Sequence, residues 1–292
     1  MAGPPNEYTV PEDWLNNVTG PLNEYLSNGA DVEAGLADGI LVDAAASGLP
    51  QTYRVPTIHH LDESAIRRTA IPDGPNHVTW EVIGAAHVDQ WSSDHTRIPS
   101  ADPKPELTRD EELARRAEFT NYGQIADPNG AICQPFPRVG SMFPRRYSLD
   151  AALVALNTWI RTGERPPSAP PVERTVTEPT SAAESLARDG DGNAIGGLRS
   201  PLIDVPVARY NGEECVQAGT TVTFSSERLA ELYPSHRSYV QRLLDATDRA
   251  VVDGFLLCDD AEAIMSAASA SDIGGADGFT AAPACAVGGP SG

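Results

Sequence analysis

The sequence has little positive charge, and Lys104 is its only lysine. Its 292 residues carry 41 Asp and Glu against 21 Lys and Arg, which gives a formal net charge of −20. Proteins that hold nucleic acid regardless of its sequence need a Lys/Arg surface to displace phosphate counterions. Anionic membranes likewise attract basic segments. We therefore expect neither nucleic acid nor a membrane surface as a partner.

Long apolar runs are also missing. No stretch approaches the ~20 apolar residues of a membrane-spanning helix, and the first residues lack the basic and apolar regions of a signal peptide. A cytoplasmic protein is the expectation, with export open if further residues precede the sequence. Hydrophobic residues make up 40% of the chain, which is enough to build a buried core over one or two domains.

Cysteine is scarce as well. The four cysteines show no C-x-x-C spacing and have no histidine neighbours: Cys133, Cys215, Cys258 and Cys285. Zinc sites in proteins combine closely spaced Cys and His ligands. The sequence therefore predicts no zinc site, and we expect no metal or other cofactor.

Two β-rich segments each lead into polar residues. Residues 53–59 are followed by Asp62 and Glu63, and residues 77–83 are followed by small residues and then His87. An acid after one strand and a histidine after a later strand is the acid-then-base part of the order Ser…Asp/Glu…His. The acid would hold the imidazole in one tautomer and stabilise the imidazolium. On this interpretation His87 is a general base.

A structural interpretation accounts for the same residues. A loop histidine often hydrogen-bonds only solvent or backbone, and paired acids after a strand are often solvated turn residues. The two interpretations differ in one respect, which is whether His87 meets a carboxylate.

The chain resembles the alpha/beta hydrolase domain family, a group of bacterial hydrolases, from about residue 20 to about 270. The resemblance covers the second half of such a protein. It implies an α/β fold: the last strands of an α/β-hydrolase sheet, with a helical and hairpin C-terminal extension. It also implies hydrolysis of a small-molecule ester or related acyl compound. The segments that carry it are residues 55–64, 80–89, 149–167, 188–199, 232–236 and 254–257.

The nucleophile of that family lies on a tight strand-to-helix turn of the form G-x-S-x-S or G-x-S-x-G, before a helix similar to residues 20–26. The sequence contains no G-x-S-x-G. Aligning the helix places Asn16 at the serine position, and asparagine has no hydroxyl to form an acyl-enzyme. Ser141 lacks the second glycine and follows His87, which is the wrong order. We expect a truncated hydrolase-like chain that is inactive as it stands; the alternative is a non-catalytic remnant or binding module that keeps the fold.

The resemblance also suggests roles for neighbouring residues. It favours Glu63 over Asp62 as the acid, because the family places its acid one position after a Thr- or Asp-type residue. Independently of the resemblance, Trp91 and His60 are candidate substrate-binding residues, because Trp91 follows the His87 strand and His60 adjoins the acids. Core packing is the alternative for both, together with turn contacts for His60.

Cys133 and Cys215 lie in loops at positions typical of the family. They would form one disulfide in an exported protein. The alternative is that both are free thiols.

Helical spacing of apolar residues predicts a helix over residues 148–162 that closes on Gly163. Ser225 and Ser235 are expected helix N-caps.

Residues 189–193 resemble the start of a calcium loop, but Ala194 and Ser200 occupy its sixth and twelfth positions, so a hairpin turn is the better interpretation. Further helices are expected over residues 20–28, 106–119, 226–232, 235–253 and 259–270, and an extended segment over 204–210.

The expected organisation follows from these elements. Residues 1–163 form the hydrolase-like domain, 164–184 a proline-rich linker, 185–270 a hairpin and helical extension that packs on it, and 271–292 a disordered tail. In a sheet limited to its last strands, the strand near 53–59 would have unpaired N–H and C=O groups. We therefore expect self-association through this edge.

Overall fold

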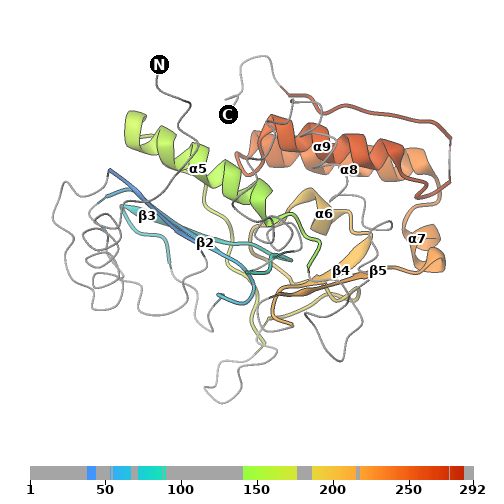
Figure 1. Cartoon of the computed structure of the whole chain (residues 1–292), viewed down its shortest axis with the longest axis horizontal. Coiled ribbons are helices and arrows are strands. Elements are labelled where there is room, and N and C mark those ends of the chain that lie inside the picture. The colour runs from blue at the N-terminus through green and yellow to red at the C-terminus, as the bar shows by residue number, and fades with distance from the viewer. Residues whose placement is uncertain are drawn as a thin grey trace, which may run out of the picture.

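The computed structural model of the chain describes residues 38–43, 53, 55–66, 72–87, 89, 141–175, 186–214, 218–275 and 277–285. In these ranges a parallel sheet lies beside a smaller antiparallel sheet, and helices cover one side of both (Figure 1). The elements in chain order are β1 (Ile40–Asp43), β2 (Thr57–Leu61), β3 (His77–Glu81), α5 (Arg145–Thr162), α6 (Pro201–Asp204), β4 (Ala208–Asn211), β5 (Thr220–Thr223), α7 (Ser226–Leu232), α8 (His236–Val252) and α9 (Cys258–Ala270).

The parallel sheet has the strand order β1-β2-β3. Thr57 of β2 pairs with Ile40 of β1 on one side and with His77 of β3 on the other. Every residue of β2 and β3 is buried, as is typical of parallel strands covered on both faces. The α/β class expected from the sequence is confirmed.

Strand β1 corrects one expectation. The sequence pattern predicts an exposed edge for the strand near residues 53–59. Instead β1 pairs with β2 and satisfies its backbone groups on that side. Four residues carry too weak a pattern to identify a strand whose partner lies further along the chain. Self-association through a sheet edge stays a prediction.

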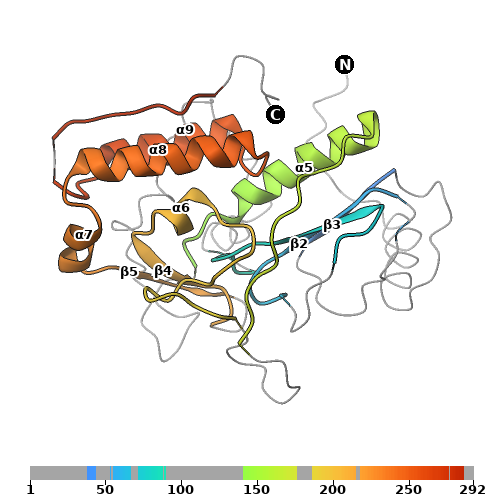
Figure 2. The same cartoon turned by 180° about the vertical axis from the view of Figure 1, so that it is seen from behind.

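Helix α5 crosses the parallel sheet on one face (Figures 1 and 2). It buries Ala151, Ala152, Leu156 and Trp159 and ends at Gly163, whose φ of 79° is the left-handed conformation that glycine adopts without strain. This confirms the helix expected over residues 148–162, which begins slightly earlier than predicted. In the ranges described, no helix is both long enough and apolar enough to cross a membrane.

Helices α7, α8 and α9 follow the predicted boundaries closely, whereas α6 was not predicted. Ser225 caps α7 by accepting the Arg228 N–H, and Ser235 forms a capping box with Ser238 at the start of α8. The predicted extended segment contributes β4, which pairs antiparallel with β5.

The predicted hairpin turn over residues 189–193 is confirmed. The Asp189 N–H donates to the Asn193 carbonyl at 2.8 Å, and Arg188 and Ala194 pair antiparallel on either side. The Asp189 carboxylate accepts the N–H groups of Asp191 and Asn193, so it serves the turn itself.

One hydrophobic core joins the two sides of the expected linker. Val78 and Trp80 of β3 belong to the same buried cluster as Leu243 of α8 and Ile264 of α9. Within the expected linker, the Glu173 N–H donates to the Ile195 carbonyl at 2.7 Å. The domain boundaries at 163 and 185 stay predictions, although the described residues on both sides share this core.

The C-terminal segment corrects another expectation. Its composition predicts disorder over residues 271–292, but residues 277–285 run along the α8–α9 pair (Figure 2). The Arg237 guanidinium lies 4.0 Å from the Phe279 ring centroid, and the Ala284 N–H donates to Asp248 Oδ1 at 2.8 Å. A few specific contacts outweigh a composition rich in Gly and Ala.

Candidate active site

The carboxyl ends of β2 and β3 bring Asp62 and His87 together. The Nδ1 atom of His87 lies 3.5 Å from Oδ2 of Asp62. The Asp62 side chain is fully buried, whereas that of His87 is 40% exposed. Because adjacent parallel strands end side by side, an acid after β2 meets a histidine from the loop after β3.

The two carboxylate oxygens of Asp62 have different partners. Oδ1 accepts the N–H of Ser64 at 2.9 Å, the hydroxyl of Ser64 at 2.5 Å and the N–H of Ala65 at 3.1 Å. Buried Oδ2 has no hydrogen-bond partner among the residues that the structure describes. A buried polar atom without a partner is costly, so Oδ2 is available to accept a hydrogen bond from His87. Such contacts are often long before substrate binds.

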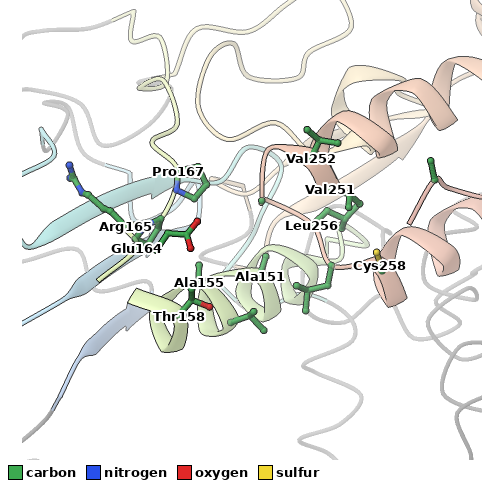
Figure 3. A pocket seen from close by; sticks show the side chains of 15 residues that line it. Ala151, Ala155, Thr158, Glu164, Arg165, Pro167, Val251, Val252, Leu256 and Cys258 are labelled. Atoms are coloured by element: carbon green, nitrogen blue, oxygen red, sulfur yellow. The ribbon is translucent and has the colours of Figure 1, made fainter. Parts of the chain in front are cut away.

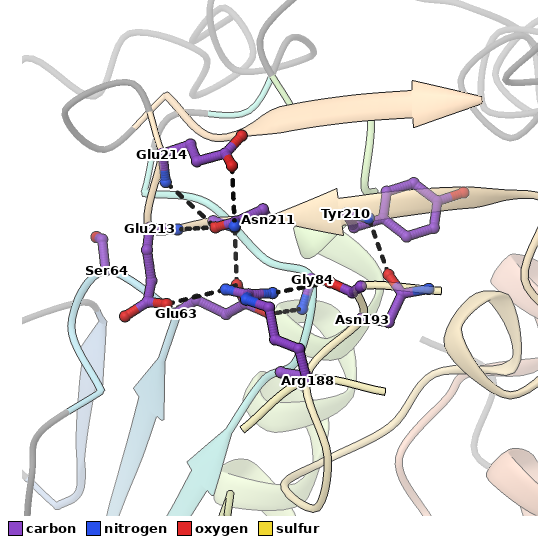
Figure 4. A network of polar contacts seen from close by, with 12 residues as sticks. Glu63, Ser64, Gly84, Arg188, Asn193, Tyr210, Asn211, Glu213 and Glu214 are labelled. Carbon is purple, nitrogen blue, oxygen red and sulfur yellow. Dashed lines mark hydrogen bonds and ion pairs between the residues drawn. The ribbon is translucent and has the colours of Figure 1, made fainter. Parts of the chain in front are cut away.

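Glu63, which the family resemblance favoured, is not beside His87. Its Oε1 accepts the Gly84 N–H at 2.8 Å, and its Oε2 accepts the Gly212 N–H at 2.8 Å and an Arg188 N–H at 2.9 Å (Figure 4). The preference for Glu63 over Asp62 was therefore wrong. Consecutive residues direct their side chains to opposite sides at the end of a strand, so only one of the two acids can face the histidine.

Glu63 and Arg188 form a buried ion pair. Burial raises the pKa of the Glu63 carboxyl, and the Arg188 guanidinium and the two glycine N–H groups oppose that rise. Burial alone would lower the pKa of Arg188, but Glu63 and Glu213 outweigh it and raise that pKa above its ordinary value. Each member of the pair therefore shifts the pKa of the other toward its charged form.

This ion pair joins three segments around the site. Gly84 belongs to the loop that leads to His87, Gly212 follows β4, and Arg188 precedes the hairpin turn. In addition, the Glu63 N–H donates to the Ala85 carbonyl at 3.0 Å. Glu63 thus fixes the segment that carries Asp62 against the segment that carries His87.

A second layer of contacts holds the segment after β4 (Figure 4). Oδ1 of Asn211 accepts the N–H groups of Glu213 at 3.0 Å and Glu214 at 3.3 Å. Glu213 accepts an Arg188 N–H at 2.9 Å. Beyond the resemblance of the segment around Arg188, no sequence signal points to these residues, because their partners are far apart along the chain.

His60, a candidate substrate-binding residue, lies instead in the core. Its ring bonds to Oδ1 of Asp43 at 3.1 Å and to Oγ of Ser148 at 2.9 Å. The arrangement looks like a serine–histidine–aspartate triad. However, His60 is fully buried, and the Ser148 hydroxyl donates to the Arg145 carbonyl at 2.9 Å. The candidate role was therefore wrong, and His60 serves packing between β2 and α5.

Arg145 completes this core network with two hydrogen bonds to the Asp43 carboxylate, at 2.6 and 2.9 Å. Burial alone would raise the pKa of Asp43, but His60 and Arg145 outweigh it, and the pKa lies below its ordinary value. The network ties β1 to β2 and to the first turn of α5.

The remaining candidates lie outside the described residues: Asn16, Trp91, Cys133 and Cys215. Their expected roles stay predictions, as does the disulfide. Within the described ranges, no group of three or more His, Cys, Asp or Glu side chains is placed to hold a metal ion.

The model of a family described as alpha/beta hydrolase domain matches residues 19–266. The sequence matches none of the curated proteins and none of the solved structures with which it was compared.

Proposed function

Because the chain belongs to the alpha/beta hydrolase domain family, we propose that its site is built for ester or related acyl hydrolysis, with His87 as general base and Asp62 as its acid. The observation that carries this proposal is the geometry of Asp62. One of its oxygens is held by the turn at Ser64. The other is buried, has no hydrogen-bond partner within the described ranges, and lies 3.5 Å from Nδ1 of His87.

The chemistry follows from that geometry. Asp62 Oδ2 accepts the proton on Nδ1 of His87, which leaves Nε2 as the proton acceptor. When Nε2 takes a proton from an attacking hydroxyl, the buried carboxylate stabilises the imidazolium. The partly exposed ring then returns the proton to the leaving alkoxide.

The nucleophile is the missing part. Asn16 stands where the family resemblance expects a serine, and an amide side chain has no proton that His87 can remove to give a nucleophile. The proposed site therefore has its acid and base but lacks the group that would attack the ester. This is the basis of the first prediction.

We expect the purified chain to hydrolyse p-nitrophenyl acetate and butyrate no faster than buffer does, because no acyl-enzyme can form without a hydroxyl at this position. Release of p-nitrophenol measures the rate, and a His87→Ala variant is the matched control. Turnover by the wild-type chain that disappears in His87→Ala would contradict the missing nucleophile while supporting His87 as the base.

The pairing of Asp62 with His87 is tested separately from activity. We expect neutral His87 to be mainly the Nδ1–H tautomer, because a carboxylate accepts the hydrogen at Nδ1. In Asp62→Asn the retained oxygen can still serve the Ser64 turn, and the amide then presents an N–H to Nδ1. The Nε2–H tautomer should therefore dominate. The ¹⁵N chemical shifts of the ring report the tautomer.

Glu63→Gln is the matched control for this experiment. It alters the neighbouring acid, whose oxygens bond to Gly84, Gly212 and Arg188 and not to His87, so the His87 tautomer should not change. A tautomer that responds to Glu63→Gln and not to Asp62→Asn would reverse the assignment of the acid.

A further inference from the structure

Two cysteines far apart in the sequence meet at the start of α9. Cys258 is the first residue of that helix, and Cys285 ends the described C-terminal segment. Both are free thiols of intermediate exposure, and the Cys258 thiol is close enough to raise the pKa of Cys285. This is a different pair from the one suggested by the family resemblance.

The path of the C-terminal segment brings the two thiols together. The Ala284 N–H donates to Asp248 Oδ1 of α8 at 2.8 Å, directly beside Cys285. Further back, the Ala281 N–H donates to Ser269 Oγ of α9 at 3.4 Å, and Phe279 stacks under Arg237. Contacts on both helices therefore hold Cys285 near Cys258.

Cys258 borders a cavity of about 360 Å³ (Figure 3). Cys258 and Ala284 line it together, and its wall is mostly apolar. The other lining residues come from α5, the segment that follows α5, the last residues of α8, and the turn between α8 and α9. The C-terminal segment thus supplies part of the wall at the point where the two cysteines meet.

We propose that Cys258 and Cys285 are a redox pair whose disulfide fastens the C-terminal segment to the start of α9. The oxidant is a small-molecule disulfide such as oxidised glutathione. Oxidation fixes the wall of the cavity, and reduction leaves the segment held only by its hydrogen bonds and ring contacts.

The two thiols have different roles in the exchange. Burial, and then the neighbouring Cys258 thiol, raise the pKa of Cys285 to about 12, and the carboxylates of Glu262 and Asp248 add to the rise. Cys285 is therefore a poor first nucleophile. The first attack therefore falls to Cys258, the first residue of α9.

Each step balances. The Cys258 thiol loses its proton and its sulfur attacks the glutathione disulfide, which forms a mixed disulfide and releases one glutathione as a thiol. The Cys285 sulfur then loses its proton and attacks the Cys258 sulfur, which forms the internal disulfide and releases the second glutathione. Two thiols are oxidised, and one glutathione disulfide is reduced to two thiols.

The experiment uses the folded full-length chain incubated with oxidised glutathione, then alkylated and digested with trypsin. No lysine or arginine follows Arg249, so Cys258 and Cys285 remain in one peptide, residues 250–292, separate from the other two cysteines. We expect this peptide to lose two hydrogen atoms and to resist alkylation until it is reduced. Two alkyl groups, or two attached glutathiones, would overturn the proposal.

Two controls test the geometry and the order of attack. Oxidation in concentrated urea should give mixed pairings that include Cys133 and Cys215, because the folded contacts are lost. In Cys285→Ser, the mixed disulfide should accumulate on Cys258 as a single glutathione adduct. An unmodified Cys258 in that variant would overturn its role as the first nucleophile.

Thermal unfolding shows whether the disulfide fastens the segment. Closing the loop between the two cysteines should raise Tm by about 5 °C in the oxidised protein relative to the reduced protein. Cys285→Ser should show no such difference between the two conditions. An internal disulfide that forms without changing Tm would overturn the fastening role.

Discussion

Replacing Arg188 by methionine should lower the free energy of unfolding by about 3–5 kcal/mol, the usual cost of removing one partner of a buried ion pair. The Glu63 side chain is fully buried, and Arg188 is the only cation that bonds to it in the described residues. Methionine fills much of the same volume, so the loss reports the unpaired carboxylate rather than a cavity. Urea unfolding followed by circular dichroism measures the change.

The pH dependence identifies the cause of this loss. Removing Arg188 removes the largest influence that lowers the pKa of Glu63, so that pKa rises further above its unfolded value. A raised pKa in the folded state costs stability as pH increases and costs nothing once the carboxyl is protonated. The deficit of Arg188→Met relative to wild type should therefore be larger at about pH 8 than near the unperturbed pKa of a glutamate, about 4.3.

Two further variants make this prediction specific. Adding Glu63→Gln to Arg188→Met should recover part of the lost stability, because a neutral amide is less costly to bury than a lone carboxylate. Arg228→Met removes the bidentate pair with Asp191, where the Arg228 side chain is 40% exposed, and should cost at most about 1 kcal/mol. Equal losses for Arg188→Met and Arg228→Met would contradict a buried role for Arg188.

Replacing Gly212 by alanine should destabilise the protein by about 3 kcal/mol through overpacking against rigid backbone. A Cβ atom at this position would lie 1.9 Å from the Ala85 carbonyl oxygen and 2.9 Å from the Glu63 Cβ. The Gly212 N–H also donates to Glu63, so any movement of this segment weakens the same carboxylate. The approach of β4 to the loop before His87 requires glycine.

Gly190→Ala is the matched control for this substitution. Gly190 lies in the hairpin turn, where an added Cβ would have no heavy atom within 4 Å, and its φ is not in the left-handed region. It should change stability by no more than about 0.5 kcal/mol, as surface substitutions usually do. The same urea titration compares both variants. Equal free energies of unfolding would show that the Gly212 segment can move away from the loop before His87 without loss of stability.

Much of the fold was predictable because its signals are local. These signals act within a few positions of the chain: the apolar spacing of residues 148–162, the serines that precede α7 and α8, and the turn residues 189–193. Capping and turn hydrogen bonds depend on neighbouring residues, so the pattern and the structure agree.

The candidate site was predictable only in part. The strand–acid and strand–histidine pattern placed His87 and the pair of acids at neighbouring strand ends. Which acid faces the histidine depends on Arg188 and Gly212, which are more than a hundred positions further along the chain. No local pattern carries that information.

The sequence by itself determined the α/β class, helices α5, α7, α8 and α9 with the serine caps of α7 and α8, and the segments that supply an acid and a histidine. These features follow from periodicity and short-range hydrogen bonding. Only the tertiary structure decided that β1 joins the sheet, that His60 bonds to Asp43 and Ser148 in the core, and that Asp62 rather than Glu63 meets His87. Each of these depends on which distant groups share a buried position, where an unpaired charge or polar atom is too costly to remain.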